Sequence, residues 1–333
     1  MMTDGLRPYT DEQRQHLDAM VRLWPHYALA MRELDDLSGG MQWKAVSGHT
    51  YLMRYRQDPV TGKKVVRSMG PRSPETEKAY VEFTAERERT KAVVEQLRPR
   101  IETMGRVAKA HRLGRVAARF TGPLRDLWRL GLMTHSDSRI AVLGGTALSF
   151  YECLFGVFMP TSLHKDRRLD LMVRHGAMDE DLVLTAAACL GRRDRVSIDR
   201  EGDHIVRLER DDGLAMTLIS KAGVAEILDG QPDLSEATRE TILDGIDLPP
   251  TAGMVVGRDA TIMAMVVLNP SAYALVSPCI ADPNDDEERS LSTSRTVLAA
   301  ELIRGSRTSF TSAQEAALGE ILEHGSAMHG LRL

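Results

Sequence analysis

Two stretches of the sequence decide the fold: VLGGTALSFYE at residues 142–152 and HKDRRLDLMV at residues 164–173. The first predicts a short strand, a turn at Gly144–Gly145 and a helix whose N-terminal N–H groups can receive the phosphates of a nucleotide. In the second, Arg168 and Asp170 lie two positions apart on a predicted strand, so both side chains point to one side of the sheet. Carboxylates at both positions would suit Mg²⁺, but only Asp170 is a carboxylate.

The composition predicts a globular protein. The chain has 333 residues, of which 43% are hydrophobic, and this suffices for a substantial core. Its apolar runs are shorter than the roughly 18 residues of a membrane-spanning helix, and its polar N-terminus does not resemble a signal peptide. We therefore expect a cytoplasmic protein with no membrane partner. The cysteines, Cys153, Cys189 and Cys279, lie far apart in apolar surroundings, which favours buried thiols over a disulfide framework or a zinc cluster.

Positive charge is concentrated in one part of the chain. The formal net charge is −4, but residues 44–129 carry 20 Lys and Arg residues against 9 Asp and Glu residues. Such a segment is typical of a region that contacts phosphates, although solvated helix faces give the same count. A nucleic-acid partner is therefore expected to bind through residues 44–129. The expected contacts are Lys44, Arg54, Arg56, Lys63, Lys64 and Arg67.

The hydrophobic pattern changes several times along the chain. Apolar residues spaced by three and four predict a helix at 9–37. Alternating residues after it predict a β-meander with a turn near residues 58–62, in which Trp43 and Tyr51 pack against the following helix. The expected segments are an N-terminal helix at 1–40, a basic β-meander at 41–72, a basic helical segment at 73–135, an α/β domain at 136–288 and C-terminal helices at 289–333.

The segment after the meander is expected to be helical. Ser73 is expected to cap a helix that is interrupted at Pro99, and shorter helices broken at Gly114 and Gly122 follow. Beyond them, short apolar strands alternate with helices, and residues 196–220 predict an antiparallel set of strands. The expected fold class is therefore α/β, of the α+β kind, with a mixed sheet flanked by helices.

Six stretches resemble the motifs of a known family in order and spacing. They are WKAVSGHTYLMRY, RSMGPRSPETE, VLGGTALSFYE, RLDLMV, GLAMTLIS and NPSAYALVS, and the match as a whole covers roughly residues 41–303. They are similar to W-K-x-x-x-G-x-x-Y-L-Y-R, S-L-G-P-R-S-P-E-T-E, V-x-G-T-x-A-L-x-x-Y-E, T-x-D-I-D-L-L, G-x-x-V-D-L-I and P-x-x-F-A-L-H-K of a bacterial family of nucleotidyltransferase-fold proteins. The resemblance implies a nucleotidyltransferase-like domain, an NTP and Mg²⁺.

Transferred residue by residue, the resemblance implies an incomplete metal site. The first two metal carboxylates fall on Arg168 and Asp170 and the third on Thr217, so one of three remains. A His-Lys pair of the family is replaced by Val276–Ser277. The implied nucleotide-binding residues are Gly144, Gly145 and Thr146.

Three hypotheses about function remain open. The first is a nucleotidyltransferase-fold protein in which the transfer of a nucleotide from an NTP to an unknown acceptor is weak or lost. The reason is that metal ions neutralise charge in such sites, which contributes several kcal/mol, and two of the three metal carboxylates are replaced here. In it, Arg167 and Arg168 could bind a phosphate directly. The second is a non-catalytic nucleic-acid-binding or protein-interaction module on the same scaffold. The third is an enzyme with relocated ligands at Asp179, Glu180 or Asp181.

Overall fold

The protein is described by a computed structural model that combines helices with one large and two small sheets, which confirms the expected mixed α/β class. The structure describes residues 5–58, 63–134, 138–165, 167–191, 195–231, 233–281, 285–306 and 309–329. Its chain forms two compact units: a small unit at Asp18–Val107, and a large unit of Met1–Leu17 together with Ala108–Leu333. This division differs from the five segments expected from the sequence.

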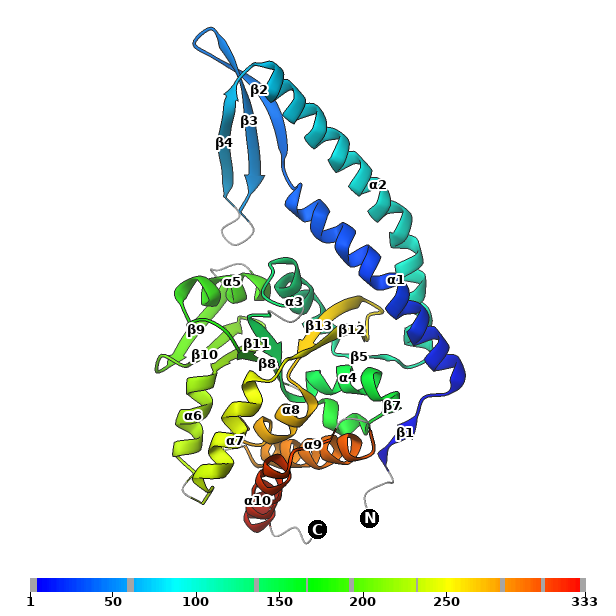
Figure 1. Ribbon diagram of the computed structural model, residues 1–333, viewed down its shortest axis with the longest axis vertical. Helices are drawn as coiled ribbons and strands as arrows, with labels where there is room; N and C mark the ends of the chain where they lie inside the picture. Colours follow the sequence, from blue (N-terminus) through cyan, green and yellow to red (C-terminus); the bar gives the residue numbers. More distant parts are fainter. Residues whose placement is uncertain are drawn as a thin grey trace. The chain divides into compact units, whose positions relative to one another are not determined.

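The small unit contains a three-stranded antiparallel meander and parts of two long helices (Figure 1). Helix α1 spans Asp11–Asp36, and α2 spans Pro74–Ala110. The strands between them are β2 at Gly40–Val46, β3 at His49–Gln57 and β4 at Lys64–Pro71, in the order β2-β3-β4. The predicted first helix and meander are confirmed, whereas the predicted turn falls largely on residues 59–62, outside the described ranges.

The two faces of the meander differ. Trp43 pairs with the fully buried Leu52 across β2 and β3, and its ring lies 6.0 Å from that of Tyr80 on α2. Trp43 therefore packs toward the helix, as predicted. Tyr51 precedes Leu52 on the same strand, so it points to the opposite face, and the prediction that it packs on α2 was wrong.

Of the three predicted helix breaks, those at Pro99 and Gly122 were wrong, and the one at Gly114 is confirmed, because Gly114 lies between two helices. Pro99 lies inside α2, where the hydrogen bonds on either side continue the helix past the missing N–H. Gly114 begins strand β5 at Gly114–Val116, and a Cβ there would stand 2.6 Å from the carbonyl oxygen of Gly257 on the next strand. Gly122 lies within helix α3 at Ala118–Arg129. Ser73 does cap α2, since its hydroxyl accepts from the N–H of Thr76.

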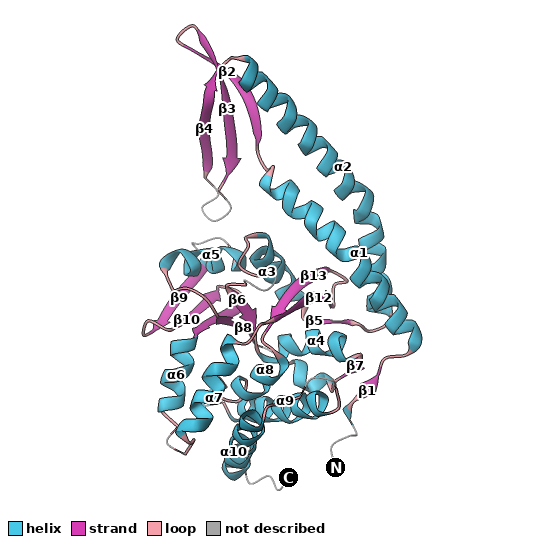
Figure 2. Cartoon of the chain, viewed as in Figure 1, coloured by secondary structure: helices cyan, strands magenta, loops and turns pink. Residues whose placement is uncertain are grey.

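The large unit is built on a mixed eight-stranded sheet in the order β5-β12-β13-β6-β8-β11-β10-β9 (Figure 2). Strands β8 and β11 are parallel neighbours, and β9, β10 and β11 form the predicted antiparallel set. The strands are β6 at Ile140–Val142, β8 at Arg168–Val173, β9 at Val196–Glu201, β10 at Ile205–Arg210, β11 at Ala215–Ser220, β12 at Thr251–Gly257 and β13 at Ile262–Val267. A two-stranded sheet joins β1 at Arg7–Pro8 to β7 at Val157–Phe158.

Helices lie on both sides of this sheet, with α3 and α5 above it and α4, α8 and α9 below it in Figure 1. Strands β6 and β8 lie between these layers, and their apolar side chains, such as Val142, Leu169 and Leu171, therefore have no access to solvent. The remaining helices are α4 at Gly144–Phe155, a 3-10 helix at Thr161–His164, α5 at Glu180–Leu190, α6 at Lys221–Asp229, α7 at Glu236–Asp247, α8 at Pro270–Val276, α9 at Asp286–Arg304 and α10 at Ser312–His329.

Candidate functional site

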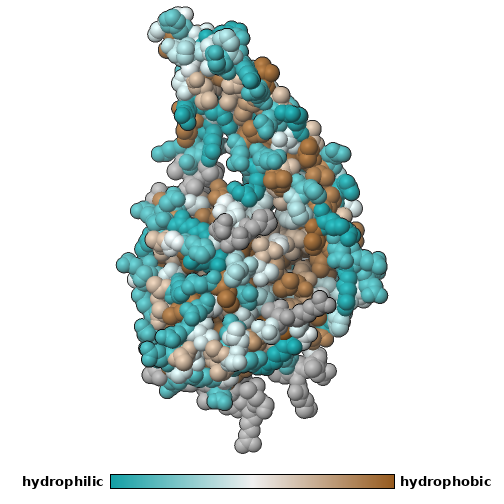
Figure 3. Space-filling model, in the orientation of Figure 1, coloured by the Kyte–Doolittle hydropathy of each residue, from teal (hydrophilic) through white to brown (hydrophobic). Residues whose placement is uncertain are grey.

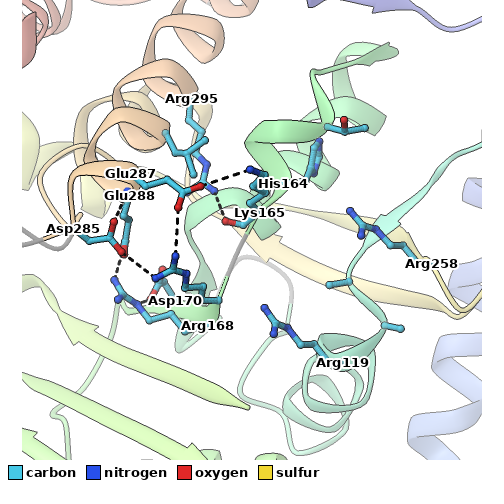
Figure 4. Close-up of a pocket in the computed structure, with 15 residues that line it drawn as sticks. Arg119, His164, Lys165, Arg168, Asp170, Arg258, Asp285, Glu287, Glu288 and Arg295 are labelled. Atoms are coloured by element: carbon cyan, nitrogen blue, oxygen red, sulfur yellow. Dashed lines mark hydrogen bonds and ion pairs between the residues drawn. The ribbon is translucent and has the colours of Figure 1, made fainter. Parts of the chain in front are cut away.

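A cavity of about 820 Å³ in the large unit is lined mainly by charged side chains. It is bounded by the start of α3, the segment from the 3-10 helix into β8, the turn after β12 and the first half of α9 (Figure 4). Six of its lining side chains are Lys or Arg and four are Asp or Glu. They are Arg119, Lys165, Arg167, Arg168, Arg258 and Arg295, with Asp170, Asp285, Glu287 and Glu288.

Arg168 joins two carboxylates from different elements. Its Nε donates to Asp170 Oδ1 at 2.7 Å, and its Nη2 donates to Glu288 Oε1 at 2.7 Å. The three side chains are only 25%, 14% and 26% exposed, so the ion pairs are partly shielded from water. Leu169 and Leu171 point into the core, and this alternation directs Arg168 and Asp170 toward the cavity. A guanidinium thus lies against Asp170, the one carboxylate at the three positions that the resemblance implies for metal ligands.

A second group of ion pairs lies at the rim of the cavity. Arg167 donates to Asp285 and to Glu287, each at 3.3 Å, and Lys165 lies 3.6 Å from Glu287. The Arg167 side chain is 80% exposed, so these contacts are weak compared with those of Arg168. Arg167 is therefore held loosely enough to turn toward an anionic ligand.

Two arginines stand apart from these carboxylates. Arg119 at the start of α3 and Arg258 after β12 lie on the other side of the cavity in Figure 4. Both are exposed, and within the described ranges the Arg258 side chain makes no hydrogen bond or ion pair. This side of the cavity therefore attracts negative charge.

Thr217 lies beside Asp170 but does not line the cavity. It pairs with Asp170 in the parallel register of β8 and β11, so the two side chains share one face of the sheet. The strand topology thus places next to each other the two positions that the resemblance implies for the second and third metal carboxylates. A hydroxyl at Thr217 supplies no negative charge there.

The Gly144–Gly145 turn begins α4 next to β8. Gly144 has φ +64°, which an L side chain rarely adopts, and its carbonyl oxygen accepts from the Tyr273 hydroxyl. The N–H of Leu143 donates to the carbonyl oxygen of Asp170, which ties the turn to β8. Gly144, Gly145 and Thr146 are buried and do not line the cavity.

The side chains around Asp170 do not suit Mg²⁺. A divalent ion there needs several carboxylate oxygens, but both nearby carboxylates are engaged by the guanidinium of Arg168. The guanidinium also repels a second cation. Among the described residues, no group of three or more His, Cys, Asp or Glu side chains could hold a metal ion.

A buried network holds the segment that enters β8. Glu152 is fully buried and accepts from Arg115 at 3.0 and 3.1 Å and from the N–H of Met159 at 2.6 Å. Its Oε1 also lies 3.1 Å from Nε2 of His164. Nearby, the buried Arg295 donates to the carbonyl oxygen of Leu163 at 2.9 Å. These contacts fix the backbone just before the arginines of the cavity.

The alternative ligand positions lie elsewhere. Asp179 caps α5 by accepting from the N–H of Leu182, and it also accepts from Arg139 at 2.8 Å. These bonds hold its pKa below the usual range, and the α5 N–H makes the largest contribution. Glu180 and Asp181 are exposed in the first turn of α5, and none of the three acids lines the cavity.

The six basic residues predicted to contact nucleic acid do not share one face. By strand register, Arg54, Arg56 and Arg67 lie on the Leu52 side of the meander, Lys44 and Lys64 lie on the Tyr51 side, and Lys63 precedes β4.

Arg54 contributes to the small unit's own packing. It donates to the carbonyl oxygen of Tyr55 at 2.7 Å, and its guanidinium lies over the Phe83 ring at 4.5 Å. Burial lowers the pKa of Arg54, and the neighbouring Arg56 and Arg87 lower it further. Arg54 is therefore a structural residue of the small unit.

No model of a known protein family and no curated protein matches the chain. Within the described ranges, no helix combines the length and the apolar character that a membrane crossing requires.

The sequence did not reveal the acidic side of the cavity. Asp285, Glu287 and Glu288 come from the start of α9, and the expected domain boundary after residue 288 cuts this helix. Acidic residues in the first turn are typical of any helix, because they face its positive end. Their proximity to Arg168, about 120 residues earlier, therefore had no signature in the sequence.

Proposed function

We propose that the protein is a nucleotidyltransferase-fold protein whose cavity binds the phosphates of a nucleotide without a metal ion, and whose Mg²⁺-dependent nucleotide transfer is weak or lost. The proposal rests on the motifs quoted above and on one observation, the Arg168 guanidinium bonded to both Asp170 and Glu288. A cation fixed in the protein stands where the family pattern implies a metal ion.

The arrangement of strands supports the first part of this proposal. A strand, a Gly-Gly turn and a helix precede β8, and β8 has the parallel neighbour β11 in the register that pairs Asp170 with Thr217. In a metal-dependent transferase of this layout, carboxylates at these positions would hold Mg²⁺ against the transferring phosphoryl group.

The charge of the cavity supports the second part. Six Lys and Arg side chains face four carboxylates, so the lining carries a net positive charge. Arginine binds phosphate with fixed, forked hydrogen bonds and remains charged at every physiological pH. Arg119, Arg258 and the loosely held Arg167 are the proposed phosphate contacts.

The first test is a transfer assay with radiolabelled ATP, GTP, CTP and UTP, offered with RNA, DNA and protein acceptors in the presence of Mg²⁺ or Mn²⁺. We expect incorporation at the level of a no-enzyme control. Robust Mg²⁺-dependent transfer to any acceptor would contradict the proposal. Failure to bind nucleotide at all would instead favour the alternative, in which the scaffold serves only for nucleic-acid or protein binding.

A further inference from the structure

One face of the meander in the small unit presents an ordered row of side chains. Tyr51, Met53 and Tyr55 alternate along the central strand β3 on the face opposite Leu52, and all three are partly exposed. Lys44 on β2 is paired with Tyr51, and Lys64 on β4 is paired with Gln57, so these two lysines flank the row on the same face. We call these five residues, Lys44, Tyr51, Met53, Tyr55 and Lys64, the open face.

The Tyr55 ring is placed by its neighbours. A Cβ at Gly40, its partner on β2, would stand 2.6 Å from the Tyr55 hydroxyl oxygen, so only glycine lets the ring lie against that strand. Lys64 Nζ lies 4.6 Å from the ring centroid. The backbone and a cation together orient an aromatic ring on a face that also exposes apolar side chains, Val66 next to Tyr55 on β4 and Val46 on β2. Hydrophilic and hydrophobic side chains are mixed on the visible surface of the meander (Figure 3).

The meander as a whole is positively charged, with Lys44 and Lys64 on the open face and Arg54, Arg56 and Arg67 on the Leu52 side. Residues 40–72 contain seven Lys and Arg residues and one acidic residue, Asp58. Lys44 and Lys64 are exposed, and no described acidic side chain forms an ion pair with either of them. These two lysines give the open face a positive charge that an anionic ligand would complement.

We propose that the open face binds single-stranded nucleic acid, with unpaired bases stacked on Tyr51 and Tyr55 and the backbone phosphates paired with Lys44 and Lys64. Four residues along a strand span about 13 Å, so the two rings are far enough apart to engage different bases of one strand. Base stacking on aromatic rings between cationic side chains is the general mode of sequence-tolerant single-strand binding.

The composition of the row favours a single strand over a duplex. Sequence reading in the major groove requires donors and acceptors that reach the base edges, such as Arg, Asn and Gln. The central strand of the open face instead offers two tyrosine rings and Met53. Ring faces can stack only on bases that are unpaired and splayed out. The proposal concerns the small unit and does not depend on the cavity of the large unit.

The test is fluorescence anisotropy of the full chain with a labelled oligothymidylate of about 15 nucleotides, within the site sizes of such surfaces, and with a duplex of equal length. At about 50 mM salt we expect binding to the single strand and weaker binding to the duplex. Tyr51→Ala and Tyr55→Ala should each lower the affinity by about 5- to 100-fold, whereas Tyr51→Phe and Tyr55→Phe should retain it, because phenylalanine keeps the ring.

Charge reversal tests the two lysines of the open face, with a second pair of lysines as the matched control. Lys44→Glu with Lys64→Glu should flatten the dependence of log K on log salt, because fewer counterions are released. Lys78→Glu with Lys91→Glu changes the net charge equally on α2 and should leave the slope unchanged. These lysine pairs keep the test decisive if an alanine variant fails to fold by circular dichroism.

Several results would overturn the proposal: no binding at about 50 mM salt, where such contacts are strong, a preference for the duplex, or equal effects of the two lysine pairs. Self-association of the chain that depends on the same residues, measured by sedimentation, would assign the open face to a second copy instead.

Discussion

Replacing Arg168 by Met removes the guanidinium but keeps most of the side-chain stem. The change deletes two hydrogen bonds of 2.7 Å, one to Asp170 and one to Glu288, and leaves two carboxylates with no cation between them. A hydrogen bond to a charged group contributes about 1.5–3 kcal/mol, and partial exposure of all three side chains lowers this value. We expect the free energy of unfolding to fall by about 2–4 kcal/mol.

Thermal unfolding followed by circular dichroism measures this loss. For a unit of this size, about 2–4 °C of Tm is lost per kcal/mol, so Tm should fall by between about 4 and 16 °C. Added MgCl₂ should restore part of the loss, because the guanidinium no longer repels the ion from Asp170 and Glu288. A site with a Kd of about 1 mM would regain about 1.4 kcal/mol at about 10 mM Mg²⁺.

The neighbouring arginine is the control. Arg167 also contacts two carboxylates, but at 3.3 Å and from a side chain that is 80% exposed. Arg167→Met should therefore lower the free energy of unfolding by less than about 1 kcal/mol, and added Mg²⁺ should not change the Tm of this variant. The reasoning is refuted if the variants of Arg167 and Arg168 lose equal stability, or if Mg²⁺ stabilises the wild-type chain as much as it stabilises Arg168→Met.

Three further predictions concern the large unit. Restoring the implied ligands with Arg168→Asp and Thr217→Asp should raise the affinity for Mn²⁺ in calorimetric titration, and an unchanged affinity would show that these positions cannot form a metal site. Glu152→Ala should lower the free energy of unfolding, measured by urea denaturation, by about 3–5 kcal/mol, because it leaves Arg115 without its buried partner. A loss below about 1 kcal/mol would contradict this role. Burial raises the pKa of the Cys279 thiol to about 12 and also raises that of Cys189, so both thiols should stay protonated at about pH 8. Both should therefore react with an aromatic disulfide reagent only after unfolding. Reaction of either thiol within minutes in the native state would contradict their burial.

Local patterns predicted the elements that carry the site. The apolar residues of β8 alternate with Arg168 and Asp170, and the glycine turn before α4 marks the preceding strand. These patterns are local because the periodicity of a strand is set by its own backbone geometry. The structure pairs Asp170 with Thr217 on neighbouring strands, the two positions that the resemblance implied for metal ligands. The local pattern alone does not specify which strands become neighbours.

The remaining features depend on contacts between distant residues. Gly114 was expected to separate two helices and does so, but nothing near it in the chain indicated that it also permits the close approach of β5 to β12. Glu288 lies 120 residues from Arg168, so its ion pair could be found only in three dimensions. In the meander, alternation correctly separated two faces, but the assignment of Tyr51 to the helix side required knowledge of which face α2 covers.

Calorimetric titration of ATP into the full chain, in MgCl₂ and then in EDTA, tests most directly the claim that Arg168 has replaced the metal ion. The account predicts binding in EDTA at least as tight as in MgCl₂, because free ATP carries more negative charge than its magnesium complex, with weaker binding when Arg119 and Arg258 are changed to alanine. Binding that requires Mg²⁺, or that is abolished by EDTA, would contradict the account.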